Sequence, residues 1–182
     1  LTFPFRRYQI QRVYRGEASQ RGRYREFYQC DIDVIGKDTL DLQYDAEIPM
    51  VIYHVFRELG FGKFTIHLNH RQVLKQFLVG LGVVDTDQQG LALREVDKLD
   101  KIEVDKVREM LLGERVGLAA DVAERLLALT GIRGGNDEVM QRLAAASDHP
   151  AYAAAVAELG RIVALLRAGG VPDEWFRINP AI

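Results

Sequence analysis

Residues 6–35 read RRYQIQRVYRGEASQRGRYREFYQCDIDVI. The runs 6–14 and 25–35 are rich in Tyr, Val, Ile and Phe, whereas the polar segment between them contains Gly16 and Gly22. Aromatic and β-branched runs on either side of a polar, glycine-containing segment are typical of a β-hairpin. The stretch therefore predicts a long antiparallel hairpin with a broad charged loop.

The second run of this hairpin has two unlike faces, because side chains alternate across a strand. Its odd positions carry Phe27, Gln29, Asp31 and Asp33. Its even positions are mostly apolar, and we interpret Cys30 among them as a small core residue. A buried carboxylate must be paired or solvated. The odd face is therefore predicted to form the floor of a polar pocket.

The residues around this face suit a nucleotide and a small substrate that carries an amine. Phe27 offers a flat surface for a planar base, and Arg15 at the end of the first run can bind a phosphate with two hydrogen bonds. The loop adds Arg21, Arg23 and Arg25 as further phosphate ligands. The pattern alone leaves a second interpretation open, which is a solvated sheet face with a charged hairpin tip.

The composition is ordinary for a globular protein, and the distribution of charge indicates what kind of ligand it binds. The chain has 182 residues, of which 48% are hydrophobic and 27% charged, and its net charge is −2. Residues 1–36 nevertheless carry seven arginines against four acidic residues, which favours an anionic ligand at one site over a polyanion bound across the whole surface. One cysteine and four scattered histidines predict no metal site, no internal disulfide and a reducing compartment.

No apolar run approaches the length that a transmembrane helix needs, so we expect no membrane span. The chain opens with Leu1 and shows no charged leader. We therefore interpret both ends as cuts in a longer protein.

The chain after the hairpin begins with a predicted helix and a predicted strand. Apolar residues recur at helical spacing over residues 46–59, with Asp45 as the expected N-cap and Gly60 as the stop signal. Residues 63–69 alternate again and predict a third strand. We expect Asn69 to cap the helix that follows.

From Arg71 the sequence becomes rich in Ala and Leu, with short Gly, Asp or Pro breaks. Its periodicity predicts helices near residues 71–81, 88–98, 103–112, 117–130, 136–146 and 151–168. Val171-Pro172 ends this series, and Trp175 to Ile178 is predicted to be extended. The chain is thus expected to leave a sheet, form a helical subdomain and return to a strand.

Specific sequence motifs resemble one known family. The residues YRGEASQRGRYREFYQCDID (14–33) resemble motif 2 of class II aminoacyl-tRNA synthetases, in which an Arg-x-Glu precedes a variable loop and a Phe-bearing strand. FPFRRYQIQ (3–11) and FTIHLNHR (64–71) are similar to histidyl-tRNA synthetases. WFRINPAI (175–182) resembles the strand before the histidine-specific Arg-Gly-Leu-Asp-Tyr-Tyr motif of that family.

The resemblance implies an α+β fold: part of the antiparallel sheet of a class II synthetase catalytic core, interrupted by an all-helical insertion. Residues 1–70 would belong to the catalytic core, residues 71–171 to the insertion and residues 172–182 to a returning core strand. It also implies a ligase that uses ATP and Mg²⁺ to activate histidine and then charges tRNA(His). The full-length protein would be a cytoplasmic homodimer. Motif 1, motif 3 and the histidine-specific motif do not occur in the sequence, so we expect this piece alone to be inactive.

The resemblance also assigns roles to individual residues of the nucleotide site. Arg15 would contact the α-phosphate of ATP and stabilise charge at the attacked phosphorus, which makes it the expected catalytic residue. Glu17 would bind near the adenine amino group, Arg23 would lie by the terminal phosphates, and Phe27 would stack on adenine.

The histidine site is assigned in the same way: Gln29 would hold the α-amino group and Asp33 the imidazole N–H. Asp31 lies on the same face without an implied role. One alternative function is a non-catalytic, synthetase-like regulatory subunit of histidine biosynthesis, of the ATP phosphoribosyltransferase regulatory type. Another is an RNA-binding module that uses the basic hairpin. The residues assigned to ATP and histidine, taken together, argue for the enzyme.

Overall fold

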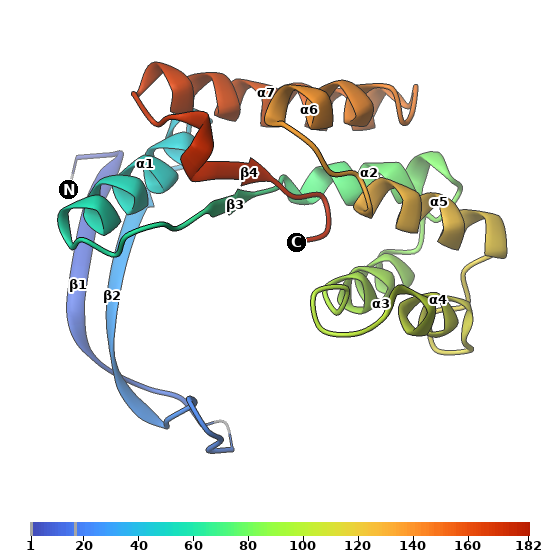
Figure 1. The fold of residues 1–182 in the computed structure, drawn as a ribbon, viewed down its shortest axis with the longest axis horizontal. Coiled ribbons are helices and arrows are strands. Elements are labelled where there is room, and N and C mark those ends of the chain that lie inside the picture. Colours follow the sequence, from blue (N-terminus) through green and yellow to red (C-terminus); the bar gives the residue numbers. More distant parts are fainter. Residues whose placement is uncertain (1, 17) are drawn as a thin grey trace.

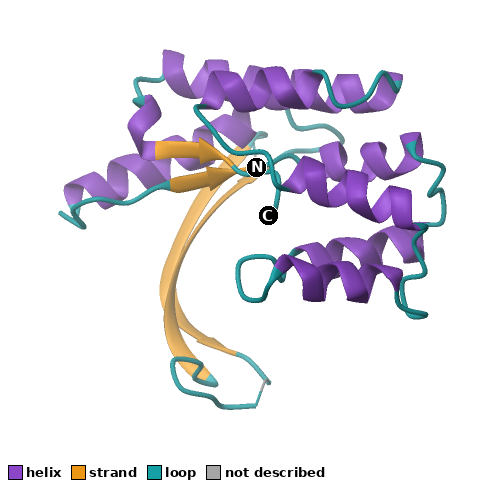
Figure 2. Ribbon diagram, turned by 45° about the vertical axis from the view of Figure 1, so that its right-hand side comes forward, coloured by secondary structure: helices purple, strands orange, loops and turns teal. Residues whose placement is uncertain are grey.

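The computed structural model describes residues 2–16 and 18–182. Across these residues the chain forms two small two-stranded sheets and seven α-helices. The first sheet is a long hairpin that extends away from the helices, as Figures 1 and 2 both show. The mixed helix and sheet composition agrees with the predicted α+β class, but the strands do not form one antiparallel sheet.

The hairpin consists of β1 (Phe5–Tyr14) and β2 (Glu26–Ile35), which pair in antiparallel register over ten residues each. The register sets Val13 opposite Phe27, so positions of equal parity share a face. Along β2 the odd positions from Phe27 to Asp33 are half-buried, while the even positions from Glu26 to Ile32 are exposed. The predicted hairpin and its two unlike faces are therefore confirmed.

The hairpin loop carries its own short turn. The Arg15 N–H donates to the Arg25 carbonyl at 2.8 Å, which continues the ladder beyond β1. Gln20 and Arg23 then exchange backbone hydrogen bonds of 3.1 and 2.9 Å. Gly22 between them has φ of +80°, a conformation that glycine adopts without steric cost. The loop therefore makes a tight turn at residues 20–23, close to the ends of the two strands at Arg15 and Arg25.

The helix α1 (Gln43–Glu58) packs against the base of the hairpin. Arg6 joins the two elements through two hydrogen bonds to the Glu47 carboxylate, of 2.5 and 2.9 Å, and this contact lowers the pKa of Glu47. The prediction of Asp45 as N-cap is wrong because the helix begins earlier. The Asp41 carboxylate accepts the Gln43 N–H at 2.9 Å, and Asp45 lies inside the first turn.

The second sheet pairs β3 (Ile66–Leu68) with β4 (Phe176–Ile178) in parallel. This parallel pair corrects the expectation from the sequence that all four strands belong to one antiparallel sheet. The two strands lie side by side at the centre of the molecule (Figure 1), although more than a hundred residues separate them in the chain. A parallel pair needs such a crossover connection, and here the helices supply it.

Asn69 is not the cap of the next helix, whose N-cap is His70. Its side-chain amide instead donates to the carbonyls of Ile182, at 2.5 Å, and Pro180, at 3.4 Å. The chain that follows β4 is therefore tied to the end of β3.

The six predicted helices between Arg71 and Ala168 are all present, with bounds within a few residues of those expected. They are α2 (Arg71–Gly80), α3 (Thr86–Val96), α4 (Val104–Leu112), α5 (Ala120–Thr130), α6 (Asn136–Ala144) and α7 (Pro150–Ala168). Within the described chain, none of the helices is both long and apolar enough to cross a membrane.

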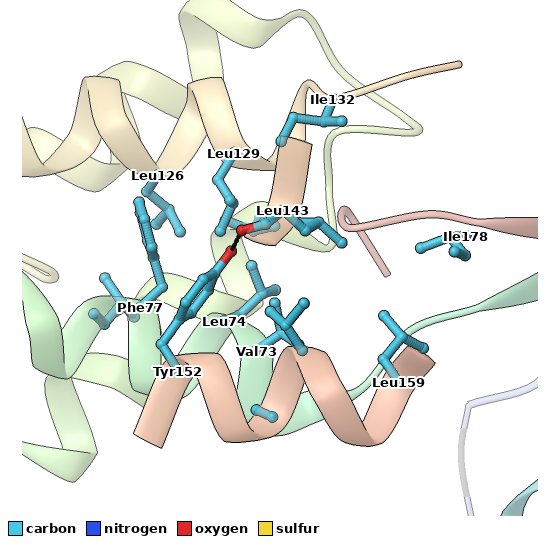
Figure 3. Close-up of a cluster of buried hydrophobic side chains, with 14 of the residues drawn as sticks. Val73, Leu74, Phe77, Leu126, Leu129, Ile132, Leu143, Tyr152, Leu159 and Ile178 are labelled. Carbon is cyan, nitrogen blue, oxygen red and sulfur yellow. Dashed lines mark hydrogen bonds between the residues drawn. The ribbon is translucent and has the colours of Figure 1, made fainter. Parts of the chain in front are cut away.

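The hydrophobic core lies among these helices (Figure 3). Tyr152 of α7 is fully buried and packs against Phe77 of α2, with ring centroids 5.6 Å apart. Its hydroxyl donates to the Leu143 carbonyl at 2.7 Å, and burial raises the pKa of Tyr152 to about 12. Asn136 connects this core to β4, since its amide accepts the Ile178 N–H at 3.0 Å and donates to the Phe176 carbonyl at 3.2 Å.

The even face of the hairpin carries large exposed apolar side chains. Tyr8 is 78% exposed and Tyr28 is 68% exposed. Cys30 on the same face is also exposed, so its interpretation as a core residue is wrong. The alternation correctly predicts which side chains share this face. Among the described residues, however, α1 packs only against the base of the hairpin, so the rest of the face is exposed.

Candidate active site on the hairpin

A cavity of about 220 Å³ lies between the hairpin loop and the start of β2. It is lined by Arg15, Ala18, Gly22, Arg23, Tyr24 and Phe27. Three of the residues predicted to bind ATP, namely Arg15, Arg23 and Phe27, thus share one cavity. The predicted residue Glu17 lies outside the described residues.

Arg15 connects the aromatic and the polar parts of the site. Its guanidinium carbon lies 4.9 Å from the centroid of the Phe27 ring, within the range of a cation–π contact. Its Nη2 donates to Oε1 of Gln29 at 3.1 Å. Arg15 therefore covers the ring that we expect to stack on a base, and it reaches the next side chain of the same face.

Gln29 has a partner at each end of its amide. Oε1 accepts from Arg15, and Nε2 donates to Oδ1 of Asp31. The row Phe27, Gln29 and Asp31 follows from strand parity, and the contact of Arg15 with it follows from the position of Arg15 one residue beyond β1.

Asp33 lies at the far end of the row and does not line the cavity. Its carboxylate pairs with Arg7 at 2.7 Å, and both side chains are 43% exposed. A surface pair of this kind contributes only about 0–1 kcal/mol, so a ligand can replace it at low cost. Arg7 was not among the predicted residues, although the hairpin register places it directly opposite Asp33.

The electrostatic character of the cavity favours an anionic, planar ligand. Two arginines, Arg15 and Arg23, line it together with the aromatic residues Tyr24 and Phe27, a combination that can bind phosphate oxygens and a planar base. Among the described residues, no group of three or more His, Cys, Asp or Glu side chains is placed to hold a metal ion.

A wider hollow of about 610 Å³ lies between the second sheet and the helices α2 and α3. Its lining includes His67, Asn69, Arg71, Arg94 and Ile182. It contains none of the predicted site residues. The hairpin cavity is where three of the six predicted site residues meet, namely Arg15, Arg23 and Phe27.

Comparisons with known proteins point to the family that the sequence motifs resemble. The sequence matches the family described as histidyl-tRNA synthetase over residues 2–181. It is 49% identical to the histidine–tRNA ligase of Xanthomonas oryzae pv. oryzae over 187 residues, which cover 100% of this chain and 40% of that protein. It is also 49% identical to the histidine–tRNA ligase of Stenotrophomonas maltophilia, with the same coverage of each chain.

Two solved structures have the same arrangement of elements. The crystal structure of histidyl-tRNA synthetase from Nostoc sp. PCC 7120 superimposes with a TM-score of 0.88 at 35% identity, covering 100% of this chain and 41% of that one. A Bacillus halodurans structure described as an ATP phosphoribosyltransferase regulatory subunit/histidyl-tRNA synthetase superimposes with a TM-score of 0.76 at 22% identity, covering 100% and 44%. That second likeness speaks for the fold alone.

The chain spans about two fifths of the length of the curated relatives described above. The match of the family covers nearly every residue of the chain, from the hairpin through the helices to β4. This chain therefore belongs to the histidyl-tRNA synthetase family.

Proposed function

We propose that this chain supplies part of the active site of a histidine–tRNA ligase. The enzyme uses ATP to convert histidine to histidyl-adenylate and transfers the histidyl group to tRNA(His). The observation that carries the proposal is the cavity in which Arg15, Arg23 and Phe27 meet, with Gln29 bonded to Arg15. Membership of the histidyl-tRNA synthetase family supports it.

ATP binds along the hairpin in this proposal. Adenine stacks on Phe27 and takes the position that the Arg15 guanidinium occupies in the free chain, 4.9 Å from the ring. Arg15 then turns to the α-phosphate, which offers it a charge-assisted, bidentate contact in place of a weaker cation–π contact. Arg23, which also lines the cavity, binds the terminal phosphates.

Histidine binds further along β2. Gln29 accepts a hydrogen bond from the α-amino group, and Asp33 accepts one from the imidazole. Gln29 and Asp33 are four residues apart on the same face of β2, about 13 Å along the strand. Their side chains must lean towards each other to hold the two ends of one histidine. Arg7 must release Asp33, or share it, when the imidazole arrives.

The first reaction needs little proton chemistry from the protein. An oxygen of the histidine carboxylate forms a bond to the α-phosphorus, the bond to the bridging oxygen breaks, and pyrophosphate leaves. Arg15 stabilises the negative charge on the phosphoryl oxygens, and the hairpin holds the two reactants in line. In the second reaction a ribose hydroxyl of tRNA attacks the activated carbonyl, and AMP leaves.

The Mg²⁺ that this reaction uses arrives with ATP, as part of the substrate. The described lining of the cavity offers two guanidinium groups and no carboxylate, and Mg²⁺ prefers oxygen ligands. These residues do not fit a protein-bound magnesium site.

The whole protein contains more than this chain, which forms part of its catalytic core and one insertion. Residues 1–70 and 172–182 belong to its catalytic core, and residues 71–171 form a helical insertion, since the six helices α2 to α7 fill that interval. The full-length protein is a cytoplasmic homodimer. The 182-residue chain alone forms no adenylate, because it spans about two fifths of its relatives.

Pyrophosphate exchange into ATP tests the proposal in the full-length protein. We expect exchange that depends on histidine and is not supported by the other amino acids, and we expect the 182-residue chain alone to give none. Absence of exchange in the full-length protein overturns the enzyme. If histidine still binds to that inactive protein, the regulatory-subunit function takes its place.

A further inference from the structure

Asp31 lies in the middle of the polar row of β2, and none of the roles above uses it. It is half-buried on the odd face, between Gln29 and Asp33. Its Oδ1 accepts a hydrogen bond from Nε2 of Gln29. The neighbouring carboxylate, Asp33, is bound instead by Arg7 at 2.7 Å. Asp31 is therefore the carboxylate of this row that contacts the Gln29 amide.

A glutamine amide can bind in two orientations, because its oxygen and its NH₂ group have nearly the same shape. The partners of Gln29 allow only one of them. A carboxylate accepts hydrogen bonds and donates none, so the NH₂ end must face Asp31. A guanidinium donates and accepts none, so the oxygen must face Arg15.

The orientation decides what Gln29 offers to a ligand. An α-ammonium group has only N–H donors, so it needs the amide oxygen and is left unpaired against the NH₂ end. The oxygen of a carbonyl has two lone pairs, so Oε1 can serve a ligand beside Arg15. Once Arg15 has moved to the phosphate, Asp31 is the partner that still holds the amide.

We propose that Asp31 is a positioning residue for amino acid recognition: it holds the Gln29 amide with its oxygen towards the α-amino group of the substrate. This inference rests on the proposed function, in which Gln29 binds that group. Asp31 does not touch the reacting atoms. It acts on the affinity for amines, and its loss lets the Gln29 amide rotate.

The test uses the full-length protein and two competitors of histidine in pyrophosphate exchange. Histidinol keeps the α-amino group, whereas imidazolepropionate lacks it. In Asp31→Ala we expect the inhibition constant of histidinol to rise by about tenfold and that of imidazolepropionate to change by less than about twofold, since one lost charge-assisted hydrogen bond is on this scale. The KM for ATP should stay within about twofold of the wild-type value.

Two further variants keep the result interpretable. Asp31→Asn retains an oxygen acceptor, so part of the histidinol affinity should return. Glu26→Ala removes a carboxylate from the opposite face of the same strand and should leave both inhibition constants unchanged. Equal weakening of both competitors by Asp31→Ala, or no weakening of histidinol, overturns the role of Asp31. A wild-type protein without histidine-dependent exchange refutes the proposed function instead.

Discussion

Replacement of Phe27 by alanine should weaken ATP binding to the full-length protein by about tenfold. Stacking of a base on an aromatic side chain contributes about 1–3 kcal/mol. In the free chain the ring already carries the Arg15 guanidinium at 4.9 Å, a contact that contributes about 0.5–1 kcal/mol at an exposed site. The Phe27→Ala variant loses the stacking contact in the ATP-bound state and the cation–π contact in the free state. Central values of about 2 and about 0.7 kcal/mol leave about 1.3 kcal/mol, close to a factor of ten.

Titration calorimetry with a non-hydrolysable ATP analogue measures this change. Tyr28→Ala is the matched control, because Tyr28 is the next residue of β2, points to the opposite face and is 68% exposed. The Tyr28→Ala variant should bind the ATP analogue with unchanged affinity, and Phe27→Tyr should retain most of the wild-type affinity. An unchanged dissociation constant in Phe27→Ala, or an equal loss in both alanine variants, refutes adenine stacking on this ring.

Three further predictions concern catalysis and stability. Arg15→Ala should slow histidyl-adenylate formation by on the order of a hundredfold or more, the effect of removing one oxyanion donor. Arg12→Ala, on the other face, should form the adenylate at nearly the wild-type rate. A nearly wild-type rate in Arg15→Ala contradicts the role of Arg15. Asn136→Ala should lower the unfolding free energy by about 3 kcal/mol, because it leaves two buried backbone groups of β4 unpaired. The midpoint of thermal unfolding should fall by roughly 9 °C, and a decrease of less than about 2 °C contradicts the structural role of Asn136. Arg167 lowers the pKa of Asp173 from the ordinary 3.8, so the ion pair stabilises the fold above pH 3.8 and this stabilisation is lost as the pH falls through the lowered pKa. Asp173→Asn should be less stable than the wild type at pH 7 by up to about 1 kcal/mol. In denaturant unfolding the free energies of the two proteins should converge in acid, and a difference that stays constant with pH contradicts the role of the ion pair.

The hairpin and the helices could be predicted from the sequence because their signals are local. Alternation along β2 sorted Phe27 and Gln29 onto one face, and the structure places them there. The apolar periodicity after Arg71 gave six helices close to those observed. The helix starts were less accurate: Asp45 offered a capping side chain, but Asp41 is the residue that meets the exposed N–H group.

Features that depend on distant partners could not be predicted in this way. The parallel pairing of β3 with β4 joins Ile66 to Phe176, and neither segment carries a local sign of its partner's direction. The apolar side chains on the even face indicated burial, yet Cys30 is exposed. Alternation indicates which side chains share a face of the strand, whereas the burial of that face depends on whether another element packs against it. The contact between Arg7 and Asp33 needs the register of the hairpin, which follows from its turn.

The position of the ligands on the hairpin is the claim on which this account depends. A crystal structure of the full-length protein with histidine and a non-hydrolysable ATP analogue measures it directly. We predict adenine stacked on the Phe27 ring, Arg15 moved from that ring to the α-phosphate, and the α-amino group within hydrogen-bond distance of Gln29 Oε1. Ligands bound away from this face, with Arg15 still on Phe27, would contradict the account.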